Sequence, residues 1–246
     1  MKVVWISAGV SSFIAGYLVK DTVDKWIYID VKDQHPDSIR FIKDCEKAIG
    51  TDIEILRSDK YKDVADVVRQ TGIINTPYGA ACTGMLKKAV RKKWEQKQYE
   101  KGISDFAYVW GMDYSESRRK DGIIRNFPEF THEFPLIDKM LSKEDCHAIL
   151  AELGIKRPKM YDLGYNNNNC IGCVKGGMGY WNKIRIDFPE VFKARAELER
   201  EIGGSCINGM FLDELDPKAG KMSKEVMEDC SILCYMAMND MKGANE

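Results

Sequence analysis

The chain has 246 residues, of which 44% are hydrophobic and 30% are charged, and its formal net charge is −1. This composition is typical of a water-soluble globular protein with one sizeable core, and the near-neutral charge indicates no general attraction to nucleic acid or to anionic membranes. No apolar run approaches the roughly 20 residues that a membrane-spanning helix needs, so we expect no membrane partner.

The chain begins with one lysine and a short apolar run, over residues 1–7. This segment lacks a small-residue cleavage site at the distance typical of a signal peptide, and it favours a first β-strand instead. We therefore expect a cytoplasmic protein. The sequence has eight cysteines, and in that compartment cysteines are reduced, metal-bound or catalytic rather than paired in disulfides.

Short apolar runs rich in β-branched and aromatic residues alternate along the chain with segments of helical spacing. The apolar runs predict strands at residues 2–7, 26–31, 52–56, 106–112 and 133–136. The helical spacing predicts helices at residues 12–19, 36–49, 61–70, 82–97 and 142–153. This alternation predicts an α/β fold with a doubly wound, mostly parallel five-stranded sheet.

The pattern changes after residue 156. A cysteine-bearing loop follows, then two helical segments at residues 178–186 and 189–201, and then a glycine-rich irregular stretch. We therefore predict an α/β domain over residues 1–156 and a cysteine-rich helical extension over residues 157–246 that packs on it.

The loop after the first predicted strand is a candidate phosphate site, because ligands of open parallel sheets bind beyond the carboxyl ends of the strands. Gly9 would let the backbone approach an anion, Ser11 and Ser12 offer hydroxyls, and the N–H groups of the following helix favour a phosphate. The alternative is a turn of small residues without a ligand. The Gly-x-x-x-x-Gly-Lys-Ser/Thr loop does not occur in the chain.

Three charged positions are further candidates. Asp30 ends the second predicted strand and would face the same crevice, or it would serve as a turn residue. Arg119 follows the fourth predicted strand and would contact phosphate or pair with Glu116 on the surface. Lys87 belongs to a basic helix that is either a solvated face or a site for an anionic group.

Two cysteines lie three residues apart, at Cys170 and Cys173, which is a spacing typical of metal ligands. Gly172 between them allows a tight turn that would point backbone N–H groups at the sulfurs. Cys82 begins a predicted helix, where the helix dipole lowers a thiol pKa. Cys230 and Cys234 are four residues apart. These positions predict one tetrathiolate centre made of Cys82, Cys170, Cys173 and one of Cys230 or Cys234, with Cys234 preferred.

The alternative is that only Cys170 and Cys173 bind a metal. Four thiolates suit an iron–sulfur cluster of the [4Fe-4S] type or zinc. The remaining cysteines divide into two predicted core residues, Cys45 and Cys146, and one that the sequence does not assign, Cys206.

A set of motifs in one order carries a family resemblance. The loop Ser-Ala-Gly-Val-Ser-Ser is followed by Ile-Asp-Val, His-Pro-Asp, Cys-Thr-x-x-Leu-Lys, Gly-Met-Asp-Tyr-Ser-Glu-Ser-Arg-Arg and Asn-Cys-x-x-Cys-Val-Lys. Over residues 2 to 200 this order resembles the phosphoadenosine phosphosulfate reductase family of the adenine nucleotide α-hydrolase-like proteins, which include the PP-loop ATP pyrophosphatases. The resemblance implies a five-stranded parallel sheet that binds ATP or a related adenine nucleotide. It implies as nucleotide-binding residues Ser7, Gly9, Ser11, Ser12, Asp30 and Arg119.

The chain departs from the family pattern in four places. The PP-loop pattern of the family is Ser-Gly-Gly-x-Asp-Ser. In this chain Ala8 replaces the first glycine of the pattern, and Ser11 replaces the aspartate, which removes a negative charge. Ala81 and Cys82 stand where the cluster-binding reductases have a double cysteine, and the Glu-Cys-Gly-x-His tail that carries the reductase nucleophile is absent. The pattern therefore looks more like the shorter bacterial and phage members of the family, including relatives that thiolate nucleic acids.

Three functions follow as hypotheses. The first is ATP-dependent adenylylation coupled to sulfur transfer, with Mg²⁺ as a candidate companion of ATP, and with Arg119 and Lys87 offsetting charge on the leaving group. The second is reduction of a sulfonucleotide by a thiolate. The third is a non-catalytic nucleotide-binding module with a structural metal site. The acceptor substrate is not defined by the sequence, with nucleic acid as one candidate, and a homodimer is left open.

Overall fold

The computed structural model describes residues 1–76 and 79–225. Its main sheet has five strands in the order β3-β2-β1-β6-β7, and all neighbouring pairs are parallel. The strands are β1 (Lys2–Ile6), β2 (Lys25–Ile29), β3 (Glu54–Leu56), β6 (Ala107–Val109) and β7 (Thr131–Glu133). The predicted fold class is therefore confirmed. The strand order reverses between β1 and β6, so the loop after β1 lies at the switch point where ligands of such sheets bind.

The apolar run of β1 becomes a central strand because both of its faces can be buried. Val4 and Ile6 join a core on one face of the sheet, whereas Val3 and Trp5 join a core on the other. This is the alternation that a strand imposes on successive side chains.

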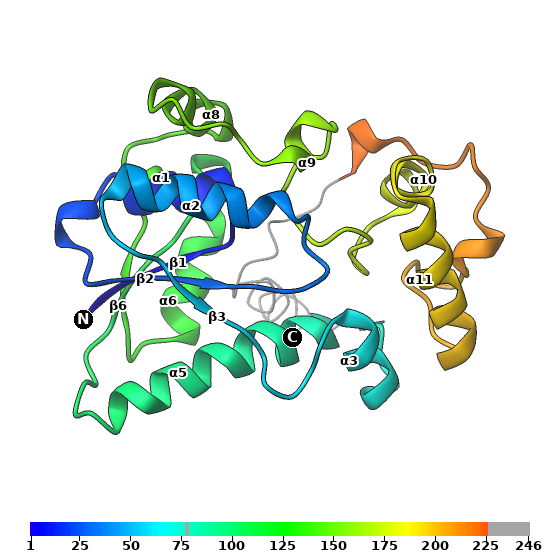
Figure 1. Cartoon of the computed structure of the whole chain (residues 1–246), viewed down its shortest axis with the longest axis horizontal. Coiled ribbons are helices and arrows are strands. Elements are labelled where there is room, and N and C mark those ends of the chain that lie inside the picture. Colours follow the sequence, from blue (N-terminus) through cyan, green and yellow to red (C-terminus); the bar gives the residue numbers. More distant parts are fainter. Residues whose placement is uncertain (77–78, 226–246) are drawn as a thin grey trace.

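Helices cover both faces of the sheet, as Figure 1 shows. One face carries α1 (Val10–Tyr17), α2 (Asp37–Ile49) and α8 (Lys143–Glu152). The other face carries α5 (Ala89–Tyr99) and α6 (Lys120–Asn126). Ser142 is the N-cap of α8, because its side chain accepts a hydrogen bond from the Asp145 N–H in a capping box.

Two differences from the sequence expectation change the type of element and not only its ends. The fifth strand ends at Glu133, and residues expected to extend it form α7 (Pro135–Asp138). Pro135 lacks the N–H of a strand ladder but suits a first helical turn. The basic helix expected over residues 82–97 is divided into α4 (Ala81–Thr83), a π-helical turn (Gly84–Lys88) and α5. Such π-helical turns are frequent at functional sites.

The remaining elements lie beyond the carboxyl ends of the strands (Figure 1). They are α3 (Val64–Thr71), α9 (Lys159–Asp162), α10 (Met178–Asp187) and α11 (Pro189–Ile202), with a small antiparallel pair, β4 (Asn75–Thr76) and β5 (Gly79–Ala80). Short 3₁₀ turns complete the described chain, at Lys20–Thr22, Tyr114–Arg119, Leu212–Glu214 and Met222–Lys224.

A third hydrophobic core joins this region to the rest of the chain. It contains Val67 of α3, Trp181 of α10 and Leu198 of α11 together with Val31, which follows β2, and Leu86 of the π-helical turn. Packing therefore links residues on both sides of residue 156, and the division into residues 1–156 and 157–246 stays a prediction. In the part of the chain that the structure describes, no helix is both long and apolar enough to cross a membrane.

Candidate functional site

The loop after β1 turns sharply into α1. Gly9 is the N-cap of α1 with an extended backbone, and Ala8 before it has a φ of 61° and is fully buried. Positive φ is unfavourable for alanine and natural for glycine. The loop thus keeps, at Ala8, a backbone conformation that suits the glycine of the PP-loop pattern.

The hydroxyls of Ser7 and Ser12 brace this loop from within. Ser12 Oγ accepts from the Ser7 N–H at 3.0 Å and donates to the Gly9 carbonyl at 2.9 Å. Because that donation uses the single hydroxyl hydrogen of Ser12, Ser7 Oγ is the donor in the 3.0 Å contact between the two hydroxyls. Ser7 Oγ also accepts from the Gly9 N–H at 3.2 Å. These predicted site residues therefore set the shape of the loop.

Ser11 lies in the packing between α1 and α8. Its side chain is buried, and its Oγ has no nitrogen or oxygen hydrogen-bond partner among the described residues. The hydroxyl lies beside the thiol of Cys146, whose pKa is raised to about 12 by burial. At the position where the family pattern has an aspartate, this chain thus directs a neutral side chain toward a helix interface.

The segment after β6 passes directly over the start of α1. A Cβ atom on Gly111 would lie 2.4 Å from the Cα atom of Ser12, closer than real side chains approach, so this crossing requires glycine. The 3₁₀ turn that follows contains Arg119, which forms an ion pair with Glu116. Arg119 therefore comes from a segment anchored beside the loop, and it has the partner that the alternative interpretation expected.

Asp30 follows the carboxyl end of β2 and is engaged with protein groups. Its carboxylate pairs with the guanidinium of Arg57 at 2.7 Å, and the Tyr28 hydroxyl lies 3.4 Å from its other oxygen. Desolvation by burial, with a contribution from the Asp30 charge, raises the pKa of Tyr28 well above its ordinary value. The Asp30–Arg57 pair joins the ends of β2 and β3 at the edge where the loop lies.

Asn168 connects the cysteine segment to the loop. Its side-chain amide donates to the carbonyl oxygen of Ala8 at 2.8 Å and to Ser38 Oγ at 3.0 Å, and the residue is 3% exposed. Tyr161 adds a second contact, because its hydroxyl accepts from the Val10 N–H at 3.4 Å. Sequence reasoning missed Asn168, although an asparagine run directly before a cysteine pair is a usable signal.

The cysteine pair itself is held by a tyrosine. Gly172 has a φ of 69°, which gives the tight turn that the sequence predicted. The Tyr180 hydroxyl accepts from the Cys173 N–H at 2.9 Å and donates to the Cys170 carbonyl at 3.0 Å. The backbone of the turn is therefore locked from α10, and the Cys173 N–H is used by the tyrosine instead of a sulfur.

Four cysteines border the same hydrophobic core. Cys170, Cys173 and Cys206 are buried within it, and Cys82 is partly buried against it. Burial raises the pKa of the Cys206 thiol strongly, with a smaller effect of nearby Glu199 and Cys173. Cys45 of α2 and Cys146 of α8, which the sequence predicts to be core residues, are buried in a different core, together with residues of α1.

Within residues 1–76 and 79–225 no three His, Cys, Asp or Glu side chains are placed so that they could hold a metal ion. Cys230 and Cys234 lie outside the described residues. The four-cysteine centre therefore stays a prediction.

A cluster of cations lies on the π-helical turn and the start of α5. Lys87 is buried in this turn. Burial, together with the positive charges of Arg91, Lys92 and Lys175, lowers the pKa of neighbouring Lys88 to about 8. Lys175 follows the cysteine pair by two positions, so the basic helix and the cysteine segment bring like charges together at one place.

The three histidines serve local structure. His35 Nδ1 accepts from the Asp37 N–H at 3.1 Å at the start of α2. His132 accepts from the Trp110 indole at 3.0 Å, and its other nitrogen lies 2.8 Å from the Phe127 carbonyl. The ring of His147 packs edge-on against Tyr161.

These features define a parallel α/β protein with a glycine-containing loop at the switch point of its sheet. The family model of the phosphoadenosine phosphosulfate reductase domain matches residues 2–176. The chain therefore belongs to the phosphoadenosine phosphosulfate reductase domain family, and the resemblance read from its motifs is confirmed.

Two other proteins are similar to this chain, one in sequence and one in fold. An uncharacterized protein of Methanocaldococcus jannaschii is 23% identical over 183 residues, which are 71% of this chain and 36% of that protein. The chain thus spans about a third of the length of this curated relative. The crystal structure of phosphoadenylyl-sulfate reductase from Candida auris in a phosphate complex matches with a TM-score of 0.50 and 12% identity, covering 69% of this chain and 80% of that one. At this identity the match shows a shared fold.

Proposed function

We propose that this protein binds ATP or a related adenine nucleotide at the loop of residues 7–12 and couples adenylylation of an acceptor to sulfur transfer. The observation that carries the proposal is the contact between Asn168 and Ala8. It joins the nucleotide-type loop to the segment that bears Cys170 and Cys173. Activation by the nucleotide and sulfur chemistry at the thiols would then take place at one edge of the sheet.

The loop supports phosphate binding through its backbone. Gly9 carries no side chain above the N-terminus of α1, and the N–H groups of the first turn beyond Val10, whose own N–H donates to the Tyr161 hydroxyl, are natural donors to an anion. Arg119 and Lys87 would offset the negative charge that develops on the leaving group. Lys87 suits this role because it is buried, where a charge acts more strongly than in water.

The proposed reaction balances without electron transfer. An oxygen of the acceptor attacks the α-phosphorus of ATP, the bond to the β,γ-phosphates breaks, and pyrophosphate leaves with the electron pair. Hydrosulfide then displaces AMP from the adenylylated acceptor, so that a carbon–sulfur bond replaces a carbon–oxygen bond. The thiols of Cys170 and Cys173 would position the incoming sulfur.

Titration calorimetry and a pyrophosphate assay test this proposal. Gly9→Val should block approach of the phosphates to the backbone and weaken ATP binding at least tenfold. A thermal melt of the same variant separates a lost site from a lost fold. Equal ATP affinity in folded Gly9→Val and in the wild type would place the nucleotide elsewhere.

Reduction of a sulfonucleotide is the second candidate, and the surroundings of Ser11 favour it. Because Ser11 replaces the loop aspartate and lies beside Cys146, the loop lacks a carboxylate for metal-assisted release of pyrophosphate. Reduction needs no pyrophosphate release. Sulfite formed from a sulfonucleotide in the presence of a thiol reductant would select this function. Nucleotide binding with neither product would select the non-catalytic module.

The metal centre is a separate proposal that rests on Cys82, Cys170, Cys173 and Cys234. Three of these cysteines border one core, although the described residues contain no group of three His, Cys, Asp or Glu side chains placed to hold a metal ion. Metal and acid-labile sulfide analysis of single Cys→Ser variants tests the set. Full metal occupancy in Cys82→Ser would remove that ligand, and loss of metal in Cys45→Ser would overturn the assignment.

A further inference from the structure

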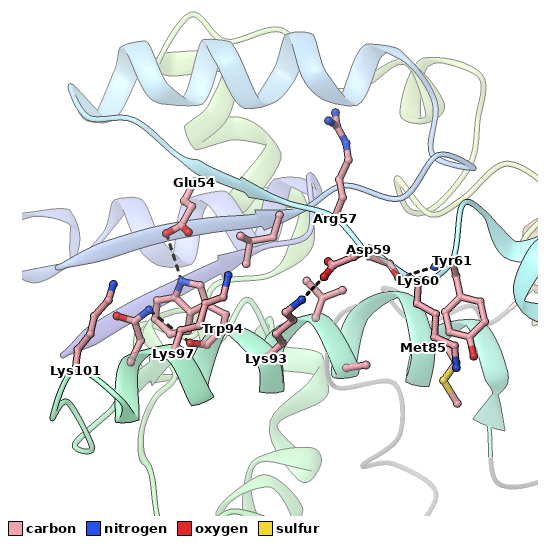
Figure 2. Close-up of a pocket in the computed structure, with 15 residues that line it drawn as sticks. Glu54, Arg57, Asp59, Lys60, Tyr61, Met85, Lys93, Trp94, Lys97 and Lys101 are labelled. Atoms are coloured by element: carbon pink, nitrogen blue, oxygen red, sulfur yellow. Dashed lines mark hydrogen bonds and ion pairs between the residues drawn. The ribbon is translucent and has the colours of Figure 1, made fainter.

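A large groove lies beside the edge strand β3, on the face of the sheet opposite to α1. It has a volume of about 930 Å³ and runs between residues 54–61, which include β3, and one side of α5. Figure 2 shows its side chains. None of the proposed nucleotide or metal residues lines it. However, Arg57 lines one end of the groove and pairs with Asp30, which follows the carboxyl end of β2. The groove therefore begins at the same edge of the sheet as the loop of residues 7–12.

Cationic side chains dominate the groove. Lys93, Lys97 and Lys101 are exposed and follow one another at intervals of four residues along α5 and just beyond its end. On a helix this interval keeps side chains on one face, with a rise of about 6 Å per step. Such a row presents positive charges at regular intervals along one wall. The opposite wall adds Arg57 and Lys60.

The acidic residues of the groove already have partners. Asp59 forms an ion pair with Lys93, and Glu54 accepts from the indole of Trp94 at 3.3 Å, contacts that Figure 2 draws as dashed lines. The lining therefore has five cationic and two acidic side chains, and a positive surplus remains after Lys93 is paired with Asp59 and Arg57 with Asp30. In a chain whose net charge is −1, this is a local concentration of positive charge suited to an anionic partner.

The floor of the groove is apolar and narrows the choice of partner. Leu56, Ala89 and Val90 line it, and the Trp94 ring below them is only 4% exposed. The floor can receive the faces of bases, but it offers no exposed aromatic ring for specific stacking. Binding would therefore come mainly from contacts between lysine side chains and the phosphates of the partner. A lysine ammonium acts as a point charge, so these contacts would not depend on the base sequence.

The groove continues toward the cysteines through Met85. This residue also lines a second hollow, of about 270 Å³, together with Lys88 and Lys175. Thr83 lines the second hollow too; it is buried, and its hydroxyl has no hydrogen-bond partner in the described part of the chain. Thr83 follows Cys82 directly, and Lys175 follows Cys173 by two positions. The two hollows thus form one basic track that ends beside the cysteines.

We propose that this track binds a single-stranded nucleic acid as the acceptor. Its phosphates would lie on Lys93, Lys97 and Lys101, and the strand would lead past Met85 to the hollow at Lys88 and Lys175. The role as acceptor rests on the proposed function, but binding of the strand does not. RNA and DNA share the phosphate groups that the lysines would bind. Separate binding measurements with an RNA and a DNA oligonucleotide distinguish the two.

Fluorescence anisotropy with the full chain and a labelled single-stranded RNA or DNA oligonucleotide tests the proposal. We expect binding that weakens as salt rises. Replacing the three lysines together, Lys93→Gln, Lys97→Gln and Lys101→Gln, should weaken binding at least tenfold at moderate salt. It should also reduce the slope of log affinity against log salt by about two, because each single-strand phosphate contact contributes about 0.7.

A matched control removes the same charge elsewhere. Lys25→Gln, Lys43→Gln and Lys47→Gln change exposed lysines at the start of β2 and on α2, outside the groove. This triple variant should keep the wild-type affinity and slope. Equal losses in both triple variants would show binding to general charge and would overturn the proposal.

A single variant tests the continuity of the track. Met85→Glu places a carboxylate where the two hollows meet, and it should weaken binding of the strand about tenfold relative to Met85→Gln. Binding of an acidic peptide in the groove, without binding of any oligonucleotide, would also overturn the proposal. ATP affinity measured in the lysine triple variant should stay at the wild-type value, so failure of the strand site and failure of the nucleotide site are read separately.

Discussion

The side-chain amide of Asn168 donates to the carbonyl oxygen of Ala8 across 2.8 Å, although 160 positions separate the two residues. One partner belongs to the loop after the central strand, and the other comes two positions before the first cysteine of the pair. Because Asn168 is buried and also donates to Ser38, its loss would leave two acceptors without this donor.

We expect Asn168→Ala to destabilise the protein by about 1–3 kcal/mol, the usual cost of unpaired buried polar groups. Nucleotide affinity should fall as well, because Ala8 would no longer be held. Thermal unfolding and calorimetry measure the two effects. Asn166→Ala is the matched control, since Asn166 is exposed and bonds only weakly to the Glu225 carbonyl. Unchanged ATP affinity in Asn168→Ala would show that this contact does not shape the site.

Tyr180→Phe should loosen the cysteine turn. The buried hydroxyl bridges the backbone of Cys170 and Cys173, so its removal takes away both of these hydrogen bonds and costs about 1–3 kcal/mol. The two thiols should also react faster with a chromogenic disulfide under native conditions. Tyr99→Phe, at a position that is 40% exposed, is the control. Identical thiol kinetics in Tyr180→Phe and wild type would contradict this role.

Gly111→Ala should be poorly tolerated because its Cβ would lie 2.4 Å from the Ser12 Cα atom. Either the segment after β6 or the start of α1 must shift, and both border the loop. We expect a lower melting temperature and weaker nucleotide binding. Gly204→Ala is the control, because its nearest neighbour would be a side-chain atom of Ile74 at 3.7 Å, an ordinary contact. Equal stability of the two variants would argue against the close crossing.

Ala8 offers a test of backbone strain in the loop. Ala8→Gly relieves an unfavourable positive φ, worth about 1–2 kcal/mol, but removes a buried methyl group worth about 0.8 kcal/mol. The net change in the free energy of unfolding should thus be less than about 1 kcal/mol. Ala8→Val should be strongly destabilising, because a β-branched residue resists this backbone conformation. Denaturant unfolding compares the pair, and a stable Ala8→Val variant would refute the assigned conformation.

Lys88 predicts a pH dependence of stability. Its pKa is about 8 in the folded chain, against an ordinary value of 10.5, because burial and the charges of Arg91, Lys92 and Lys175 disfavour the protonated form. Between these pH values the unfolded chain binds more protons, so the contribution of Lys88 to the unfolding free energy rises with pH.

Lys88→Met should therefore stabilise the protein most below pH 8, and its advantage should shrink as the pH approaches 10.5. Denaturant unfolding at pH 7 and at pH 10 measures this difference. Lys43→Met, on exposed α2 surface, provides the baseline. A constant difference between Lys88→Met and wild type at the two pH values would disprove a lowered pKa at this position.

The amino-acid sequence determined the features that depend on near neighbours along the chain. The apolar run of β1 could only be a strand buried on both faces, and Gly172 between two cysteines required a tight turn. The alternation of strand and helix led to the parallel sheet, and the order of motifs led to the family. The boundary errors near Pro135 and within residues 82–97 arose where local helical geometry changed over a few residues.

Tertiary structure alone decided which distant groups meet. Ser7 and Ser12 look alike in sequence to Ser11, yet two of these hydroxyls brace the loop and the third faces Cys146. The sequence around Arg57 and Lys97 did not predict a groove. A groove requires two walls, and β3 and α5 are brought together only when the helix packs on the sheet. Periodicity and turn chemistry are properties of a local segment, whereas a hydrogen bond such as Asn168 to Ala8 depends on how the whole chain closes on itself.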